Sequence, residues 1–424
     1  MSLVPWLRTL FGQGQDVAPS AEGLATLAAE MQRELDGNIL PFWLKQARNP
    51  KTGGFWGEIS FDGRKRLSGP RGALLTARIL WTFAAAQSRD PRPDHLAMAR
   101  YAYDDLTRHF TDPAHGGLHW SIGAKGDVLH GHKQVYVQVF GIYGLVEYHR
   151  ATASTEALEQ AQALYRLIEA HAADRGNDGY HEAMTADWSG TEEVLPDGGV
   201  ALGHAKSQNT TLHVMEAYAA LYEVWPDPAL KAALIAVCRH LIDRIFDPAT
   251  GHLRLFFDAG WKPVHEHFSP GHDLECAWLL RRAAQATGEA ALIAQARTVT
   301  IALARSNLQI IEGDGALVYE AGPEGVVDPL KQWWVEAEAV VGYLEAYELT
   351  GEAAFYAAAI NAWSFIKRRL IDRRRGEWFG DLTRAGRPVH ASPKLSFWKC
   401  PYHNGRMCME VIDRARRLGL RLND

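Results

Sequence analysis

Cysteine is scarce in this chain of 424 residues, which has only Cys238, Cys276, Cys400 and Cys408. No two of them have the C-x-x-C spacing of a zinc site, and four cysteines are too few to staple a chain this long with disulfides. We therefore expect reduced cysteines in a cytoplasmic protein, without a disulfide framework or a cysteine-bound metal.

Long apolar segments are also missing. No stretch reaches the roughly 18 apolar residues that mark a membrane-spanning helix. Residues 1–11 are weakly amphipathic, and no long apolar core with a small-residue cleavage site follows them. We therefore expect neither an export signal nor a membrane partner.

The chain has no strong excess of charge of either sign. Its 45 basic and 50 acidic residues give a formal net charge of −5, and no run of like charges is longer than the three in Arg373-Arg374-Arg375. Nucleic-acid binding requires a basic patch or stripe, so we expect no nucleic-acid partner. A neutral or weakly polar small molecule fits this composition better.

What the chain does contain is a repeat, marked by a glycine turn after which aromatic or other apolar residues follow. Six copies align, and their last glycines are separated by 63, 62, 72, 64 and 61 residues. Each copy predicts a short β-hairpin. The turns are Gly53-Gly54, Gly116-Gly117, Asp178-Gly179, Thr250-Gly251, Asp314-Gly315 and Arg375-Gly376.

Two segments with apolar residues at helical spacing lie between consecutive hairpins, for example residues 74–85 and 95–110. Such helix pairs can bury their apolar faces only against neighbouring pairs. We therefore predict an all-α fold, an (α/α)6 barrel with short β-hairpins linking the helix pairs at one end. The alternative is an open solenoid, but no unit looks like a capping repeat. We expect one barrel domain at residues 21–424 after an N-terminal extension at residues 1–20.

The two helices of each pair differ in their polar residues. The helix before a hairpin is amphipathic, which is typical of an outer shell. The helix after a hairpin carries polar or aromatic groups near its first turns, and in a closed barrel these groups converge at one end of the central cavity. Buried polar groups are costly unless they bind something, so this end is the predicted site. Its candidates are Arg78, Tyr136, Gln138, Asn209, His213, Glu216, His272, Glu275, Trp333, Trp334, Glu338, His403, Arg406 and Glu410.

Histidine and carboxylate pairs dominate these candidates. Asn209, His213 and Glu216 share one helix face at i, i+4 and i+7, and His272 with Glu275 has the spacing i, i+3. Because imidazole has a pKa of about 6.5, it can take and return a proton near neutral pH. His-x-x-Glu pairs also suit a divalent metal, an alternative that ranks second because no further ligand motif supports it. The predicted proton-transfer residues are His213, His272 and His403.

Aromatic and basic residues near these positions favour a sugar. Trp334 and Trp398 could stack on the apolar face of a sugar ring, although plain core packing is the alternative for either one. Arg78 could stabilise an oxyanion that develops on a carbonyl, whereas a structural ion pair with an inner-helix glutamate is its alternative.

Four segments carry a family resemblance: residues 206–218 (KSQNTTLHVMEAY), 271–275 (GHDLE), 333–338 (WWVEAE) and 397–406 (FWKCPYHNGR). They resemble cellobiose 2-epimerases, within the N-acylglucosamine 2-epimerase superfamily, and the similarity runs from about Phe42 to Arg416. The resemblance implies the same (α/α)6 barrel and an isomerase that inverts carbon 2 of a reducing-end aldose, from the glucose to the mannose configuration.

The resemblance also implies roles for individual residues. His272 and His403 would act as acid and base on opposite faces of carbon 2, through an ene-diolate, while His213 assists ring opening. No metal or organic cofactor is implied, and we expect a monomer or homodimer. The implied substrate-binding residues are Arg78, Tyr136, Asn209, Glu275, Trp334, Glu338 and Trp398.

Several positions depart from the usual cellobiose pattern and leave the preferred sugar open, namely Gln208, Thr211, Ser269-Pro270 and Glu336. A monosaccharide mannose/glucose 2-epimerase or an aldose-ketose isomerase could carry the same residues, because both outcomes share the ene-diolate.

Two more distant alternatives belong to other classes. A glycoside hydrolase needs two carboxylates that flank the scissile bond, and Glu275, Glu338 or Asp273 could be assigned to them. That assignment leaves three histidines unexplained. The last alternative is a sugar-binding protein without catalysis.

Overall fold

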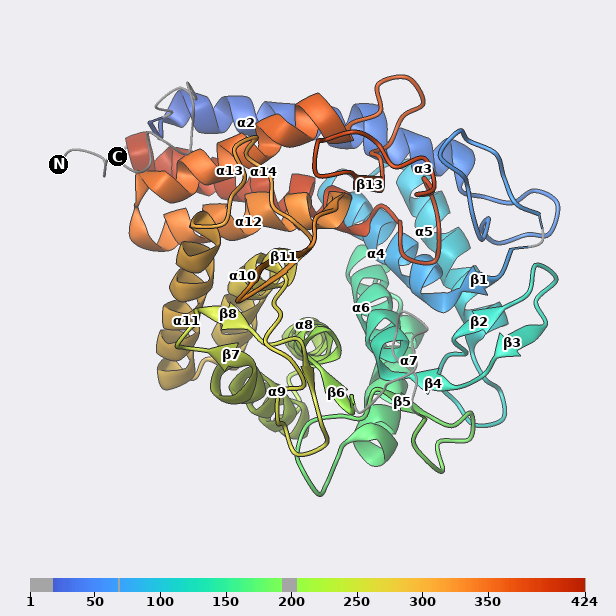
Figure 1. Cartoon of the computed structure of the whole chain (residues 1–424). Coiled ribbons are helices and arrows are strands. Elements are labelled where there is room, and N and C mark those ends of the chain that lie inside the picture. Colours follow the sequence, from blue (N-terminus) through green and yellow to red (C-terminus); the bar gives the residue numbers. More distant parts are fainter. Residues whose placement is uncertain (1–17, 68, 193–203, 424) are drawn as a thin grey trace.

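The inner helices form a closed ring in the computed structural model, which describes residues 18–67, 69–192 and 204–423. Each inner helix contacts the next, and the last contacts the first, so the barrel prediction is confirmed and the open solenoid is wrong (Figure 1). The inner helices are α4 (Ala73–Arg89), α6 (Val135–Thr152), α8 (Gln208–Val224), α10 (Pro270–Thr287), α12 (Trp333–Thr350) and α14 (Tyr402–Asn423).

The outer helices pack against the inner ring, one on each inner helix. Those that follow their inner partner in sequence are α5 (Pro93–Asp105), α7 (Thr155–Leu167), α9 (Pro228–His240), α11 (Ala290–Leu308) and α13 (Ala353–Phe365). The partner of α14 is α2 (Ala21–Glu34), so the first and last described helices complete the barrel. Residues 1–17 lie outside the described residues, and the extension at residues 1–20 therefore stays a prediction.

Most outer helices end in a single wider turn of π-helix. The first and last residues of each such turn are buried apolar residues, which continue the apolar face of the helix toward the hairpin end. The turns are η1 (Leu35–Ile39), after which α3 (Leu40–Gln46) follows, η2 (Leu106–Phe110), η3 (Ile168–Ala172), η4 (Leu241–Ile245) and η5 (Ile366–Leu370).

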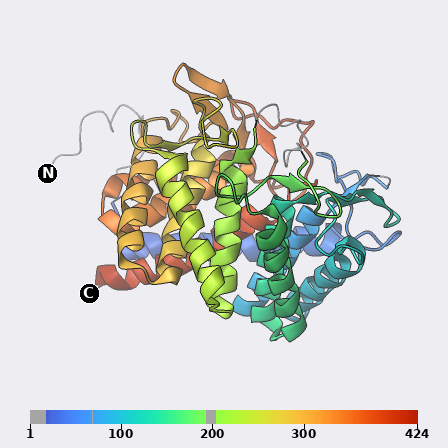
Figure 2. The same cartoon turned by 90° about the horizontal axis from the view of Figure 1, so that it is seen from below.

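Strands and loops gather at one end of the helices (Figure 2). The last glycine of every predicted turn has a positive φ, between 62° and 89°, a conformation that favours glycine because it has no Cβ. The turns are closed by short antiparallel bridges such as Thr111 with Leu118. The predicted hairpins are therefore present, although most are shorter than a regular two-stranded hairpin.

The strands also join neighbouring repeats, which the sequence did not indicate. In four places a two-residue strand lies directly before an inner helix. This strand forms an antiparallel pair with a strand that follows the next glycine turn. These pairs are β1 (Arg71–Gly72) with β2 (Ser121–Ile122), β4 (Lys133–Gln134) with β5 (Ala183–Met184), β6 (Lys206–Ser207) with β9 (Phe256–Phe257), and β12 (Lys331–Gln332) with β13 (Asp381–Leu382). The remaining strands are β3 (Val128–His130), β7 (Phe246–Asp247), β8 (His252–Leu253), β10 (Glu320–Gly322) and β11 (Gly325–Asp328).

A buried ion pair recurs at these junctions. An aspartate just before a glycine turn accepts a hydrogen bond from a lysine just before an inner helix, as in Lys133 Nζ to Asp112 Oδ2 at 2.6 Å and Lys206 Nζ to Asp174 Oδ2 at 2.7 Å. Related ion pairs join Lys331 to Asp314 at 2.6 Å, where Asp314 is 39% exposed, and Lys394, in the loop before α14, to Asp372 at 2.9 Å. These pairs fix the hairpin end of the barrel relative to the helices.

None of the described helices combines the length and the apolar character that crossing a bilayer requires. The apolar side chains instead fill the space between the two rings of helices. The barrel therefore leaves its hairpin end as the place where polar side chains of the inner helices meet.

We predict that replacing Lys133 with Met lowers the free energy of unfolding by about 3–5 kcal/mol, because Asp112 is left buried without its cation. The matched control is Lys231→Met, which removes an ion pair with Glu289 whose side chains are 33% and 50% exposed. It should leave the free energy of unfolding nearly unchanged, because solvent screens this exposed pair. Urea denaturation followed by circular dichroism measures both, and equal effects would contradict the structural role of the repeated pair.

Candidate active site

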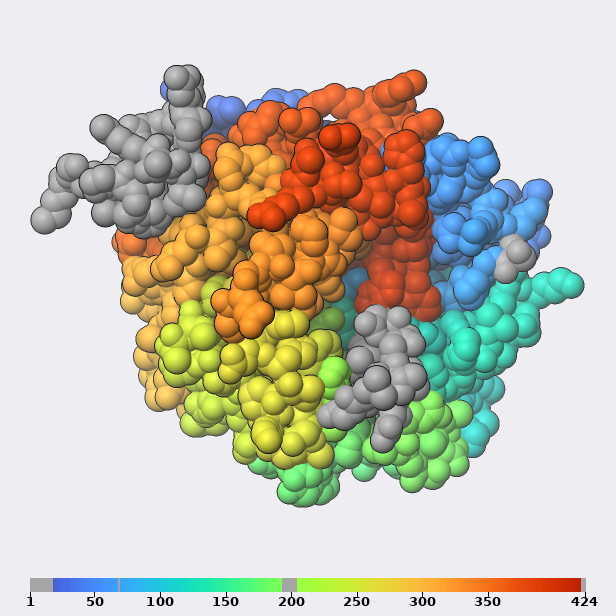
Figure 3. Space-filling model, viewed as in Figure 1, coloured from blue at the N-terminus to red at the C-terminus, as the bar shows by residue number. Residues whose placement is uncertain are grey.

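A cavity of about 370 Å³ opens at the hairpin end of the barrel. Its wall consists of the first turns of the inner helices and of residues from the hairpins. In the space-filling view of this face, hairpin segments coloured yellow, orange and red gather over the centre of the ring (Figure 3). The cavity is therefore deep, with helices below and hairpins around its mouth.

Inner helices present the same positions to this cavity. Their second and sixth residues lie four apart, on one helix face, and most cavity-lining helix residues occupy one of these positions. Tyr136, Asn209, Trp334 and His403 are second residues, Arg78, His213 and Glu275 are sixth residues, and His272 is a third residue. With Trp398 from the preceding loop, nine of the ten predicted site residues line the cavity.

In α6 and α10 the fourth residue faces away from the cavity and holds a hairpin. The Gln138 side chain bonds both backbone groups of Leu118, at 2.7 and 2.8 Å, and Asp273 Oδ1 accepts from the Leu253 amide at 2.8 Å. The expectation that Gln138 faces the cavity is therefore wrong, and so is the one for Glu410, which lies 3.6 Å from Arg282 and does not line it.

His213 is paired with Glu216, as predicted from their spacing. Nδ1 of His213 lies 2.8 Å from Oε2 of Glu216. Burial alone would raise the pKa of Glu216, but Arg406 and His213 lower it to about 2. Because an ionised carboxylate only accepts hydrogen bonds, Nδ1 carries the proton and Nε2 is left with the lone pair. Burial lowers the pKa of His213, so the ring is neutral at pH 7.

His403 has an equivalent partner in Glu338, on the neighbouring helix. Its Nδ1 lies 2.8 Å from Glu338 Oε1, and Glu338 also accepts from Trp278 Nε1 at 3.0 Å and Arg406 Nη2 at 2.7 Å. With donors on all sides, Glu338 is a carboxylate, and Nε2 of His403 keeps the lone pair. Burial and the nearby Arg78 hold the pKa of His403 well below its usual range. Glu338 thus lies behind His403 rather than on the cavity wall, which corrects its predicted substrate contact.

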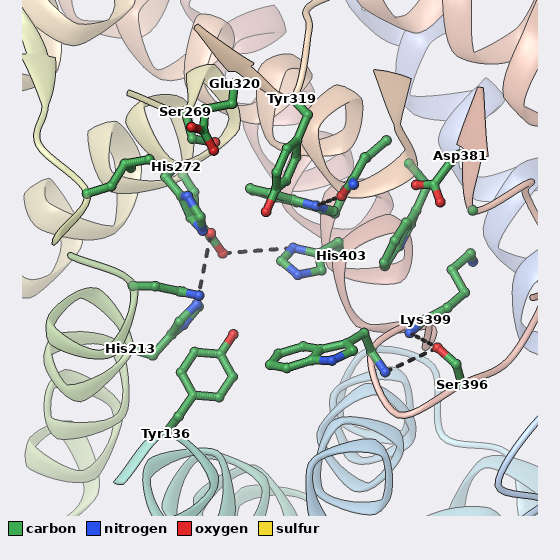
Figure 4. A pocket seen from close by; sticks show the side chains of 18 of the residues that line it. Tyr136, His213, Ser269, His272, Tyr319, Glu320, Asp381, Ser396, Lys399 and His403 are labelled. Atoms are coloured by element: carbon green, nitrogen blue, oxygen red, sulfur yellow. Dashed lines mark hydrogen bonds and ion pairs between the residues drawn. The ribbon is translucent and has the colours of Figure 1, made fainter. Parts of the chain in front are cut away.

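His272 differs from the prediction, which paired it with Glu275. Its Nδ1 is buried and has no hydrogen-bond partner among the described residues, and its ring packs on Trp334 with 4.7 Å between centroids. Oε1 of Glu275 instead accepts a hydrogen bond from Arg406 Nη2 at 2.5 Å. Burial and His213 lower the pKa of His272 to about 3, so this imidazole too is neutral at pH 7. The rings of His213, His272 and His403 point into one space (Figure 4).

Arg406 connects the carboxylates behind the histidines. Its Nη2 donates to Glu275 and Glu338, its Nη1 donates to Glu216, and the side chain is only 1% exposed. One cation therefore faces three buried carboxylates. Burial and the neighbouring Glu338 raise the pKa of Glu275 to about 8, so Glu275 keeps a proton at neutral pH. It lies 3.8 Å from His403 Nδ1 and 4.0 Å from His213 Nε2.

Among the described residues, three of this cluster could hold a metal ion. Glu275, Glu338 and His403 offer ligand atoms within 4.8 Å of one another. However, the guanidinium of Arg406 already occupies the Oε1 atoms of both glutamates, and Nδ1 of His403 is bonded to Glu338. The cation that these carboxylates require is thus supplied by the protein, which argues against the metal alternative.

Arg78 faces the cavity without a carboxylate partner. Its Nη2 donates to Tyr136 Oη at 2.8 Å, and its guanidinium lies 4.2 Å from the ring centroid of Phe140. No carboxylate of a described residue lies within 4.0 Å of it, so the alternative of a structural ion pair is wrong. A permanent positive charge is therefore available to a bound ligand beside Tyr136.

Glu377 supports the segment that carries Trp398 and His403, and it was not predicted. It is fully buried, has a φ of 58°, and accepts hydrogen bonds from Lys399 Nζ, Asn404 Nδ2 (2.7 Å) and Trp43 Nε1 (2.9 Å). Glu377 follows the last glycine turn, where most other repeats have an apolar residue. A carboxylate at this position was the signal that could have found it.

Other cavity residues come from the hairpins, which the prediction left out. They occur just before an inner helix or a few residues after a glycine turn, so their repeat position could have indicated them. They include Ser207, Phe256, Ser269, Tyr319, Glu320, Gln332, Asp381, Ser392, Ser396 and Lys399.

Comparison with known proteins agrees with this geometry. Residues 54–403 match the family model of N-acylglucosamine 2-epimerase (GlcNAc 2-epimerase). This chain belongs to that family. A cellobiose 2-epimerase from Bacteroides fragilis is 40% identical over 387 residues, 91% of this chain and 98% of the relative.

Solved structures agree with the fold of this family member. The structure of cellobiose 2-epimerase from Bacillus thermoamylovorans B4167 has a TM-score of 0.86 at 34% identity, over 92% of this chain and 100% of that chain. A crystal structure of D-mannose isomerase, at 19% identity and a TM-score of 0.79, covers 91% of this chain and 97% of its own and shares the fold.

We predict that Arg406→Met makes stability fall with rising pH. Without the guanidinium, the buried carboxylates of this cluster repel one another, and the pKa of Glu275 rises further above its unfolded value. The folded protein then binds more protons than the unfolded chain, so the stability present at pH 5 is lost as the pH approaches 8.

At pH 7 the free energy of unfolding of Arg406→Met should be about 3–5 kcal/mol lower than that of the parent protein. Urea unfolding at pH 5 and pH 8 measures it, with Arg305→Met, whose side chain is 55% exposed, as the control. A loss of equal size at both pH values would show that the three carboxylates do not depend on this cation.

Proposed function

We propose that this carbohydrate epimerase inverts carbon 2 of the reducing-end aldose of a cellobiose-type disaccharide, from the glucose to the mannose configuration. The observation that carries the proposal is the placement of two neutral imidazoles against one indole. The rings of His272 and His403, from different inner helices, lie 4.7 and 5.6 Å from that of Trp334. A sugar in this space can meet a base on either face.

In the proposed reaction one imidazole removes the proton from carbon 2 of the open-chain aldose. The electron pair of that C–H bond forms the double bond between carbons 1 and 2, and the carbonyl oxygen becomes an oxyanion. The other imidazole takes a proton from solvent on its cavity-facing nitrogen and returns it to the opposite face of carbon 2. The carbonyl forms again, and the first imidazole releases its proton to solvent. Neutral rings suit this chemistry, because a histidine with a lowered pKa is already unprotonated at pH 7.

The negative charge of the ene-diolate has two sources of stabilisation in this site. Arg78 faces the cavity with a permanent charge, and no carboxylate of the described residues lies within 4.0 Å of it. The inner helices also begin at the cavity, and their amino-terminal ends carry partial positive charge. Donors placed in advance where charge develops are the most effective form of such stabilisation.

Ring opening and proton supply are proposed for the groups behind the cavity. Glu216 holds the Nδ1 proton of His213, so Nε2 can accept the proton of the anomeric hydroxyl. Glu275 keeps a proton between His213 and His403, because burial and Glu338 raise its pKa to about 8. Nδ1 of His403 already carries a proton, so the ring nitrogen that can take the Glu275 proton is Nε2 of His213, where it supports ring opening.

The size and lining of the cavity support a disaccharide. A volume of about 370 Å³ lies within the roughly 300–1,000 Å³ of drug-sized ligand sites. Trp398 stands at 5.7 Å from Tyr136, and Trp334 packs between the proposed bases, so each offers a ring face or edge to a sugar. The names of the similar enzymes point to cellobiose.

The carboxylates of the site do not suit a glycoside hydrolase. Such an enzyme needs two carboxylates on opposite sides of the scissile bond, at roughly 5–9.5 Å. Here Glu275 and Glu338 share one guanidinium group, and Asp273 faces a hairpin. Of these three carboxylates only Glu275 lines the cavity, and one carboxylate does not make such a pair.

We predict that the protein incorporates deuterium from heavy water at carbon 2 of cellobiose and forms the 2-epimer without cleavage. Cellobiose, glucose and mannose are incubated separately, and products are followed by nuclear magnetic resonance and mass. Release of monosaccharides would identify a hydrolase, and accumulation of a ketose would identify an isomerase.

His272→Asn and His403→Asn serve as the matched pair for the two-base assignment. Each variant should lose epimerisation by at least about 100-fold, the lower range for a general base. Each should still exchange deuterium into one epimer, and the two variants into opposite epimers, because one base remains on one face. Near parental turnover in either variant would refute the assignment.

We predict that Glu275→Gln and Glu338→Gln differ strongly at pH 7. Glutamine resembles the protonated Glu275, so Glu275→Gln should lower kcat by less than about 10-fold. Glu338 must accept hydrogen bonds from three donors, so Glu338→Gln should lower kcat by roughly 100-fold.

The alkaline limb of the pH-rate profile should also reflect Glu275. Because its pKa is raised to about 8, the proton is held below that pH and lost above it. Activity should therefore decline above about pH 8 in the parent protein and decline less in Glu275→Gln. Equal losses in both glutamine variants would contradict the proposed protonation states.

A further inference from the structure

Two buried polar side chains on the wall between α8 and α10 have no hydrogen-bond partner among the described residues. Gln208, the first residue of α8, is 0% exposed, yet neither Oε1 nor Nε2 makes a hydrogen bond among the described residues. Ser269, the residue before α10, is 2% exposed, and its Oγ is likewise unpaired and does not cap the helix. Both residues line the cavity.

The same wall carries two further unpaired atoms, Asn209 Oδ1 and His272 Nδ1. Asn209 follows Gln208 directly, and His272 lies three residues after Ser269, so the four groups sit at the amino-terminal ends of two neighbouring helices. Phe256, which also lines the cavity, comes from the strand that pairs with the residues before α8. The unpaired atoms therefore form a polar patch beside a proposed base.

Gln138 shows what a structural glutamine looks like in this fold. It too is 0% exposed and lies near the start of an inner helix, but both of its amide atoms bond the backbone of Leu118. A buried polar group without a partner costs about 1–3 kcal/mol, so Gln208 and Ser269 reduce the stability of the free protein. Groups that cost stability in this way are typical of binding sites.

We propose that Gln208 and Ser269 are a specificity-determining pair that hydrogen-bonds hydroxyl groups of the bound sugar. The inference rests on the proposed function and deepens it, because it identifies which wall of the cavity distinguishes one sugar from another. An amide and a hydroxyl both donate and accept, and so does each sugar hydroxyl, whereas an apolar ligand group would leave them unpaired. A site built in this way rejects an analogue that lacks the hydroxyl.

The test compares Gln208→Met and Ser269→Ala with the parent protein on cellobiose and on its monodeoxy derivatives, leaving carbons 1 and 2 intact. For the parent, kcat/KM should fall about 10- to 100-fold on at least one derivative, as expected for one or two lost buried hydrogen bonds. For Gln208→Met or Ser269→Ala, kcat/KM on cellobiose should be lower than that of the parent. It should not fall further when that derivative replaces cellobiose. If, on every derivative, kcat/KM of each variant falls by the same factor as that of the parent, the proposal is wrong.

Melting temperature gives a second measurement, with Gln138→Met as the matched control. Gln208→Met should leave the melting temperature of the sugar-free protein unchanged or higher, because an unpaired polar group becomes apolar. Gln138→Met should lower it, because two hydrogen bonds are lost. A decrease in Gln208→Met as large as in the control would assign Gln208 a structural role and overturn the proposal.

Binding of cellobiose by calorimetry separates this proposal from the function on which it rests. If the parent epimerises cellobiose, and Gln208→Met and Ser269→Ala bind and convert it as well as the parent does, the proposed specificity pair is wrong. The proposed epimerase function is then unaffected. If the parent binds cellobiose without exchange at carbon 2, and Gln208→Met binds it about 10-fold more weakly, the pair stands and the function is wrong.

Discussion

The site depends on one buried guanidinium among three carboxylates. Arg406 binds Glu216, Glu275 and Glu338, each from a different inner helix, so it holds three helices in register at the floor of the cavity. Two of these carboxylates then hold the Nδ1 protons of His213 and His403 and turn each Nε2 toward the sugar space. The third keeps a proton of its own. Protonation states across the site thus follow from a single charge balance, one cation against three acids.

The inner helices divide their work by position. Most helix residues that line the cavity are second or sixth residues, and in three of the helices the fourth residue, Gln138, Asp273 or Glu336, bonds the backbone of a hairpin. Lysines just before the helices pair with aspartates at the glycine turns and hold the same hairpins from the other side. Site and scaffold are therefore built from the same repeat, and a cavity side chain is placed by the hairpins next to it.

The repeat also explains which site residues could be predicted. His213 and Glu216 are on one helix face, so their spacing was enough to pair them. His272 and Glu275 have the same spacing, but Glu275 is drawn to Arg406 on another helix, and His403 takes Glu338 instead. Helical spacing limits which side chains share a face, whereas the partner each one chooses depends on charges that come from other helices.

The sequence by itself determined the ring of helix pairs, the end at which polar groups meet, and the set of histidines, because glycine turns and apolar periodicity are local and recur along the chain. Only the tertiary structure decided how those groups pair. Contacts such as Arg406 with Glu216, or Glu377 with Lys399, join positions far apart in the chain or on different elements, and they arise where the closed barrel excludes water. Burial then fixes which acids keep their protons, and no pattern along the chain carries that information.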